Sequence, residues 1–137
     1  GKFELSEERL IRDRLAESLK YIVSQRLVPK SGGGRVAALE ILKNTIRIRE
    51  LIIHGEEGDN TFTTVLEQSG TYGMQTFDNH LARLYSQGVI HEEMAMLQGS
   101  DKSKLGQMID RIKSQRGEKV TDIDNLELDL DYERRGW

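Results

Sequence analysis

The sequence predicts a mainly α-helical fold with a single β-hairpin. Several segments carry apolar residues at helical spacing between an N-capping residue and a glycine, a pattern typical of short amphipathic helices. Two runs of β-forming residues flank the three glycines at 32–34, which indicates a hairpin. The length of 137 residues and the 31% charged residues fit one domain with one core.

Composition narrows the class of protein. The chain has no cysteine, so it has no disulfide and no thiolate metal site. Its net charge of -3 argues against a dominant nucleic-acid surface. No apolar run reaches the ~18 residues of a spanning helix, and the charged start GKFELSEERL is unlike a secretory signal. We therefore expect a cytoplasmic protein without a transmembrane segment.

The first element is predicted as a helix over residues 6–23. Ser6 is a good N-cap, and two glutamates follow it, where the helix dipole favours negative charge. The apolar stripe at helical spacing consists of Ile11, Leu15, Leu19 and Ile22, widened by Leu10 and Val23.

The predicted hairpin follows, with Pro29 near the end of its first strand. Residues 36–42 of the second strand are apolar nearly throughout, which suits a strand covered on both faces. Because two strands alone are marginally stable in water, the pattern predicts that the hairpin completes a sheet whose other strands lie outside this chain.

Short helices are predicted from residue 44 onward. Asn44 or Thr45 caps the first, which ends at Gly55, and Asn60 or Thr61 opens the second. In GMQTFD, residues 73–78, we expect Gly73 to end one helix in a left-handed turn and Thr76 to cap the next. Met74 would then pack as a staple against the new helix. A short helix over 92–97 and a last helix, capped by Ser100 or Asp101 and ended by Gly117, complete this part.

Residues 118–137 form an acidic tail. Four apolar residues, Leu126, Leu128, Leu130 and Tyr132, alternate with carboxylates, which is the period of a strand. The acidity favours a mobile, solvated tail, and the rival interpretation is strand addition to an uncovered sheet edge.

No catalytic or metal motif is assembled. The three histidines, His54, His80 and His91, lack the spacing of a ligand pair, so we expect no metal site. The glycine run does not fit a phosphate loop, since Gly34 leads into a strand, and no GxSxG elbow is present. Arg47 and Arg49 are more informative, because a guanidinium on this helix can reach a carboxylate or phosphate at a subunit boundary. The alternative for both is a solvated helix face.

The combined blocks resemble a known family. Five blocks follow one another in the order found in the C-terminal part of the PilT-type twitching-motility ATPases. They are RLAESLKYIVSQRLVPK, GRVAALEILKNT, a short Ile-Arg helix, GMQTFD and LYSQGVI. The likeness covers about residues 10–101. It implies the C-terminal part of a RecA-like P-loop ATPase domain followed by a bundle of short helices. The implied division is a helix plus hairpin completing a RecA-like sheet over 1–43, a helical subdomain over 44–117 and the tail over 118–137.

The resemblance also implies a function for the parent protein. PilT-type enzymes are homo-hexameric motors that use ATP and Mg²⁺ for type IV pilus retraction at the cytoplasmic face of the bacterial membrane, where an inner-membrane platform protein receives the force. The Walker A and B segments of such enzymes are missing here, so we expect this chain alone to be an inactive C-terminal fragment without bound cofactor.

Particular residues acquire expected roles from the resemblance. Gln25 and Arg26 are expected near the nucleotide. The family's retraction signature, Ala-Ile-Arg-Asn-Leu-Ile, corresponds to residues 47–52, in which Ile48, Arg49, Leu51 and Ile52 agree, while Arg47 and Glu50 depart from it. The family motif GMQTFD comprises Gly73, Met74, Gln75, Thr76, Phe77 and Asp78, with Gln75 and Asp78 serving either a subunit contact or local capping.

Two other functions are alternatives. The chain can be read as a free-standing helical module whose hairpin acts as the wing of a DNA binder, although its charge disfavours this. A hydrolase is the other alternative, and it lacks a nucleophile and base.

Overall fold

The computed structural model describes residues 4–118, as six α-helices and one antiparallel hairpin. The elements in chain order are α1 (Leu5–Ser18), β1 (Tyr21–Pro29), β2 (Arg35–Lys43), α2 (Ile46–His54), α3 (Phe62–Gln68), the 3₁₀ turn η1 (Gly70–Tyr72), α4 (Phe77–Ser86), α5 (Glu92–Gln98) and α6 (Lys102–Gln115). The predicted fold class, mainly α with one β-hairpin, is confirmed. None of these helices is long and apolar enough to cross a membrane.

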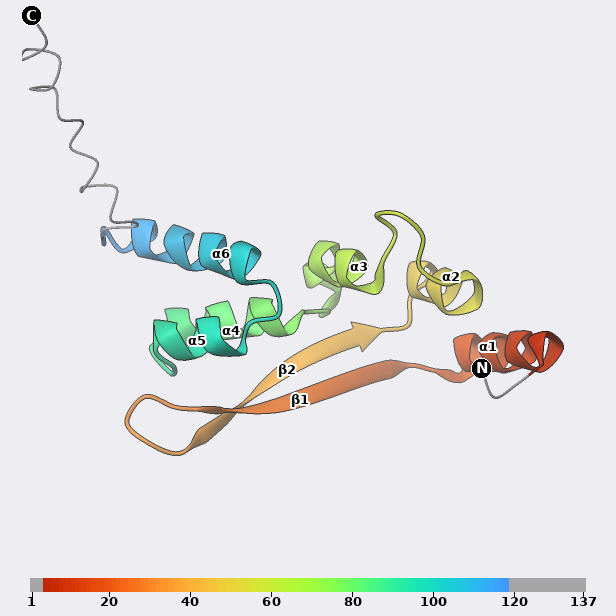
Figure 1. Cartoon of the computed structure of the whole chain (residues 1–137), viewed down its shortest axis with the longest axis horizontal. Helices are drawn as coiled ribbons and strands as arrows, with labels where there is room; N and C mark the ends of the chain where they lie inside the picture. Colours follow the sequence, from red (N-terminus) through yellow and green to blue (C-terminus); the bar gives the residue numbers. More distant parts are fainter. Residues whose placement is uncertain (1–3, 119–137) are drawn as a thin grey trace, which may run out of the picture.

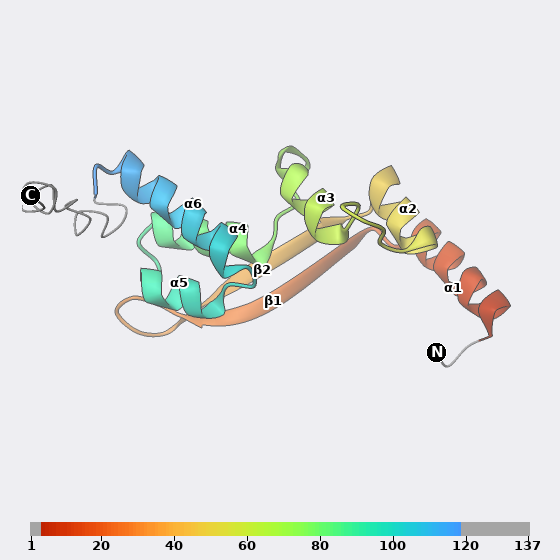
Figure 2. The ribbon, with the colours of Figure 1, turned by 45° about the horizontal axis from the view of Figure 1, so that its top comes forward.

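The hairpin is the long axis of the molecule. Its nine pairs run from Tyr21↔Lys43 to Pro29↔Arg35. Helices α4, α5 and α6 lie over one face near the turn, whereas α1 and α2 lie at the opposite end (Figure 1). The view turned by 45° shows the same arrangement (Figure 2).

Two separate hydrophobic clusters hold the helices to the strands. The first joins the hairpin to α4, α5 and α6, and its core consists of Val28, Ala38, Phe77, Leu81, Ala82, Leu84, Tyr85, Ile90, Ala95, Leu105 and Ile109. The second joins α1, α2 and α3, and it consists of Ala16, Leu42, Ile48, Leu51, Ile52, Val65, Leu66 and Met74. Strand β2 contributes to both, through Ala38 and Leu42.

The first helix is shorter than predicted. It ends at Ser18, and the next residue, Leu19, is extended. Ile22 and Val23, which the sequence analysis placed on the helical stripe, lie in β1 and pair with Leu42 and Ile41. Their β-branched side chains favour a strand, and pairing with β2 decides the outcome over helical spacing.

The capping of α1 also differs from the prediction. Helix α1 begins at Leu5 after Glu4, which makes no side-chain capping bond, so Ser6 is not the N-cap. Asn44 does not cap α2; its amide donates to the carbonyls of Ala16 (2.8 Å) and Leu19 (2.7 Å) and so closes the end of α1. Thr45 is the cap of α2.

The face of the hairpin opposite the helices is uncovered by the described residues. Strand alternation places Tyr21, Val23 and Leu27 on this face. Their side chains are 57%, 59% and 49% exposed, although all three are apolar or aromatic. On β2 the same face carries the half-buried Ala37, Leu39 and Ile41. This is the distribution expected of a strand pair made to pack against more protein.

Candidate functional site: the GMQTFD junction and the Arg49 helix

The GMQTFD segment connects the two hydrophobic clusters. Gly73 adopts the left-handed conformation (φ 81°) that ends the turn η1, as predicted. Met74 is buried, but in the cluster of α2 and α3 rather than against α4, so its predicted role as a staple for α4 is wrong. The preceding turn points this side chain back toward α3. The segment therefore contacts one cluster through Met74 and the other through Phe77.

Gln75 pairs with the outer edge of β2. Its main chain exchanges hydrogen bonds with Ile41, and its side-chain Nε2 donates to the carbonyl of Leu39 at 2.8 Å. Its Oε1 accepts a bond from Arg83 at 2.8 Å, which leaves the amide satisfied on both sides. All of these partners lie within this chain and hold Gln75 against β2, and a subunit contact of Gln75 stays a prediction.

Thr76 begins α4 with a capping box. Its hydroxyl accepts a bond from the Asn79 N–H at 3.1 Å, and the Asn79 Oδ1 accepts one from the Thr76 N–H at 3.3 Å. The predicted cap is therefore confirmed. Glu40 adds an anion at the same place, because its carboxylate accepts a bond from the Phe77 N–H at 3.2 Å.

Asp78 connects the start of α4 to the start of α6 through hydrogen bonds. Its two carboxylate oxygens accept bonds from the N–H groups of Ser100 and Asp101, both at 2.8 Å. The side chain is buried, with 8% of it exposed, so these bonds are formed away from water. The neighbouring Gly99 leaves room for Leu105, since a Cβ there would lie 2.5 Å from Leu105 Cδ2, whereas its distance of 3.7 Å from Asp78 Oδ1 would be an ordinary contact.

His80 supports the same edge of the sheet. Its Nδ1 accepts a bond from the Leu39 N–H at 2.8 Å. Burial lowers the pKa of His80, and the nearby Arg83 cation lowers it further. The neutral form that this bond requires is thereby favoured.

Arg26 lies against Phe77 of the junction. Its guanidinium carbon is 4.2 Å from the ring centroid, and Nη1 donates to the carbonyl of Gln98 at 3.2 Å. Gln25 is exposed and, as the adjacent strand residue, lies on the opposite face of the hairpin. The side chains of Gln25 and Arg26 therefore point to opposite faces of the hairpin, and their place near the nucleotide of the parent stays a prediction.

Helix α2 carries the signature residues on two faces. Ile48, Leu51 and Ile52 are buried in the second cluster, at 0%, 1% and 8% exposure. Arg49 is exposed, and its side chain forms no hydrogen bond or ion pair with the described residues. Arg47, also exposed, donates to Gln68 Oε1 at 2.9 Å. The helix is therefore seated by its apolar residues and presents a free guanidinium at Arg49.

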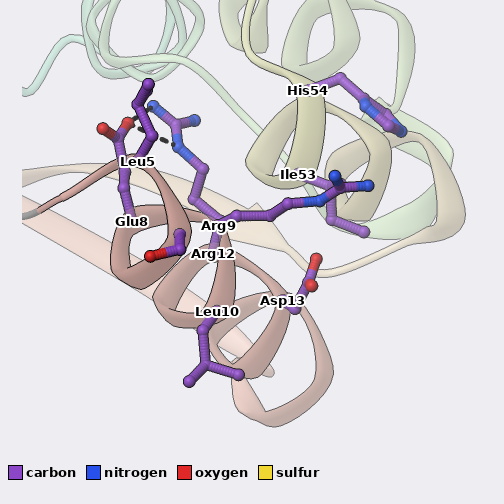
Figure 3. A pocket seen from close by; sticks show the side chains of 9 residues that line it. Leu5, Glu8, Arg9, Leu10, Arg12, Asp13, Ile53 and His54 are labelled. Atoms are coloured by element: carbon purple, nitrogen blue, oxygen red, sulfur yellow. Dashed lines mark hydrogen bonds and ion pairs between the residues drawn. The ribbon is translucent and has the colours of Figure 1, made fainter.

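A shallow pocket of about 710 Å³ lies where α1 meets the end of α2 (Figure 3). Its lining includes Arg9, Asp13, Ile53 and His54. Arg12 bonds Glu8 at 2.9 Å and reaches across to the carbonyl of Ile52 at 3.2 Å. These groups tie α1 to α2, but they supply no nucleophile and base pair. Within residues 4–118 no group of three His, Asp or Glu side chains is placed to hold a metal ion.

Comparison with known proteins identifies the class from the fold. The structure superposes on the *Legionella pneumophila* ATPase DotB with a TM-score of 0.53 and 22% identity, over 69% of this chain and 25% of that one. The pilus retraction motor PilT with bound ADP gives a TM-score of 0.60 and 36% identity, over 77% of this chain and 29% of that one. The fold is that of a portion of an ATPase of the kind represented by PilT and DotB.

Sequence comparison gives the family. The chain is 41% identical over 93 residues to the type IV pilus retraction ATPase PilT of *Pseudomonas aeruginosa* and 41% identical over 96 residues to its type IV pilus ATPase PilU. These matches cover 68% and 69% of this chain. No protein-family model matches the chain. The chain belongs to the PilT-type ATPases by this homology, and it spans about a quarter of the length of the curated relatives it matches.

Proposed function

We propose that this chain acts as the C-terminal portion of a subunit of a hexameric ATPase motor that powers type IV pilus retraction. The homology to PilT carries the proposal. ATP and Mg²⁺ are then bound by other parts of the parent protein, and this portion converts ATP turnover into movement. The parent works at the cytoplasmic face of the membrane, where an inner-membrane platform protein receives the force.

The hairpin is proposed to complete the RecA-like sheet of the parent. The outer edge of β2 is occupied by Gln75 and His80. On β1, the outward N–H and C=O groups at Val23, Gln25 and Leu27 have no partner among the described residues. A further strand is therefore expected along β1, and the uncovered apolar face beside it packs on the parent's helices. This supports a division into 1–43, which joins the parent sheet, and 44–117, which forms the helical subdomain.

Arg49 is proposed as the coupling residue of this portion. It is the exposed member of the signature, on a helix whose other signature residues are buried. Its planar guanidinium can bind a carboxylate on a neighbouring element or subunit through two parallel hydrogen bonds, with less entropy lost per bond than a lysine would lose. Its contact would be made or broken as the ring moves.

The test is Arg49→Ala in the complete parent protein, with Arg47→Ala as the matched control. Both residues are exposed and lie within one turn of α2, but Arg47 departs from the signature, which has alanine at that position. We expect Arg49→Ala to retain most ATP turnover and to reduce twitching strongly, while Arg47→Ala retains both. Unchanged twitching in Arg49→Ala, or an equal loss in both variants, would refute the coupling role.

The alternative of a winged DNA-binding module is disfavoured, because the relatives are pilus ATPases. Binding to a DNA duplex with a steep salt dependence would revive it.

A further inference from the structure

A groove with a basic rim runs between α4 and α6. It has a volume of about 530 Å³, an apolar floor of Ala82, Met108 and Ile112, and a rim that includes Arg83, Arg111 and Arg116. Residues 102–116 contain five basic residues and one acidic residue, and two of the basic residues, Lys104 and Lys113, pair with Glu67 and Glu92.

The charges of the three rim arginines are little neutralised by acidic side chains. Arg111 is exposed, and its side chain has no hydrogen bond or ion pair among the described residues. Arg83 donates only to the neutral Gln75. Arg116 lies over the Tyr85 ring at 5.1 Å and donates to main-chain carbonyls of α4. The groove therefore offers three cations and an apolar floor to an anionic, amphipathic segment.

The end of α6 lies at this groove, because Gln115 and Arg116 are part of its lining. Gly117 is left-handed (φ 71°), and the N–H groups of Gly117 and Glu118 donate to the carbonyls of Ser114 and Lys113, which makes a Schellman cap. Glu118 already lies at the rim, with its Oε1 3.7 Å from Arg116 Nη1.

The residues that follow have the complementary chemistry. Between 118 and 133 the sequence contains seven acidic residues and one lysine. In an extended conformation the alternation in LELDLDY places leucines on one side and carboxylates on the other. The leucines match the apolar floor, and the carboxylates match the arginine rim.

The length is also sufficient. The stretch of α6 from Met108 to Arg116 spans about 12 Å at 1.5 Å per residue, which about four residues of extended chain can follow. We propose that residues 122–133 fold back along α6 and bind in the α4–α6 groove of the same molecule. This proposal concerns the part of the chain that the PilT homology does not explain, and it does not depend on the motor function.

Nitroxide labelling of the intact chain tests the proposal. The chain has no cysteine, so one introduced cysteine carries a single label. Gln115→Cys places the label in the groove, and Gln25→Cys places it on the exposed strand β1. We expect the label at 115 to broaden the amide signals of residues 126–132 in the NMR spectrum, and the label at 25 to leave them sharp.

Three results would overturn the proposal. Broadening from position 25 instead indicates strand addition to β1. No broadening from either position shows an undocked tail. In a mixed sample, one chain carries the isotope label without nitroxide, and the other carries the nitroxide without isotope label. Broadening that persists in this sample shows that a second copy supplies the segment.

A charge reversal tests the role of the rim. Arg111→Glu is expected to reduce the broadening from position 115 at least twofold, whereas Arg9→Glu, a matched exposed arginine on α1, should leave it unchanged. Raising the salt concentration should act in the same direction as Arg111→Glu, because the charges of the rim are partly exposed. Broadening unaffected by Arg111→Glu would show that charge does not hold the segment.

Discussion

Gln75 pairs with Ile41 as if it were one residue of a third strand. The Ile41 N–H donates to the Gln75 carbonyl at 2.9 Å, and the Gln75 N–H donates back to the Ile41 carbonyl at 3.1 Å. Together with the two side-chain bonds to Leu39, this pairing occupies the outer edge of β2. The sheet can therefore be extended along β1 but not along β2.

The first prediction concerns Asp78. Asp78→Ala should lower the free energy of unfolding by about 1.5–3 kcal/mol, because two amide donors lose a charged acceptor in a buried place. Urea unfolding measures the loss, and hydrogen exchange should accelerate at Ser100 and Asp101. The exposed Asp59→Ala is the control and should change neither quantity. Normal protection at Ser100 and Asp101 in Asp78→Ala would contradict the assignment.

Gly99 is predicted to tolerate no side chain. Gly99→Ala introduces a Cβ 2.5 Å from Leu105 Cδ2, in a cluster where Leu105 is fully buried. Overpacking of this kind costs about 1–3 kcal/mol, to be measured as a lower urea midpoint. Gly70→Ala serves as the control, since a Cβ there meets nothing within 4 Å. Equal midpoints for the two variants would show that the α5–α6 connection adjusts freely.

Thr76 should stabilise α4 through its hydroxyl. Thr76→Ala is expected to cost about 1 kcal/mol of unfolding free energy, and Thr76→Ser to cost less, because serine keeps the capping oxygen. Thermal unfolding of the two variants decides the matter. If serine and alanine were equally destabilising, the methyl group rather than the cap would be the cause.

The lowered pKa of His80 predicts that the stability of the fold depends on pH. Because its pKa is lowered in the folded protein, the unfolded chain takes up the proton first as the pH falls. The contribution of neutral His80 is fully present above pH 6.5, the ordinary pKa of histidine in an unfolded chain, and is lost as the pH falls from there through the lower folded-state pKa. Urea midpoints across this range should decrease with falling pH.

His80→Gln is the comparison for that series. Glutamine does not titrate, so this part of the decrease should disappear from the variant. An identical pH profile in the two proteins would show that His80 is not responsible.

The starts of the helices were predictable because capping is local. Thr45, Thr61, Thr76 and Asp101 each accept a bond from an N–H three residues further on, and the sequence alone contains all the groups involved. The end of α1 was not predictable in this way. Residues 19–23 satisfy both helical spacing and strand preference, and only pairing with β2, some twenty residues away, decides between them.

The candidate site shows the same limit. The sequence singled out Gln75 and Asp78, but not the groups that satisfy them, since Leu39 and Ser100 are far away along the chain. Glu40, His80 and Gly99 were missed as supporting residues for this reason. The one available signal was Gly99 immediately before the capping pair Ser100 and Asp101, where a close approach of another element is common.

Strand β2 enters both hydrophobic clusters, with Ala38 in one and Leu42 in the other. A hydrogen-bonded strand hardly stretches, so its two ends keep a fixed spacing. A movement of α2 that displaces Leu42 is therefore expected to reach the helices near the hairpin turn through β2 itself, without passing through a flexible loop.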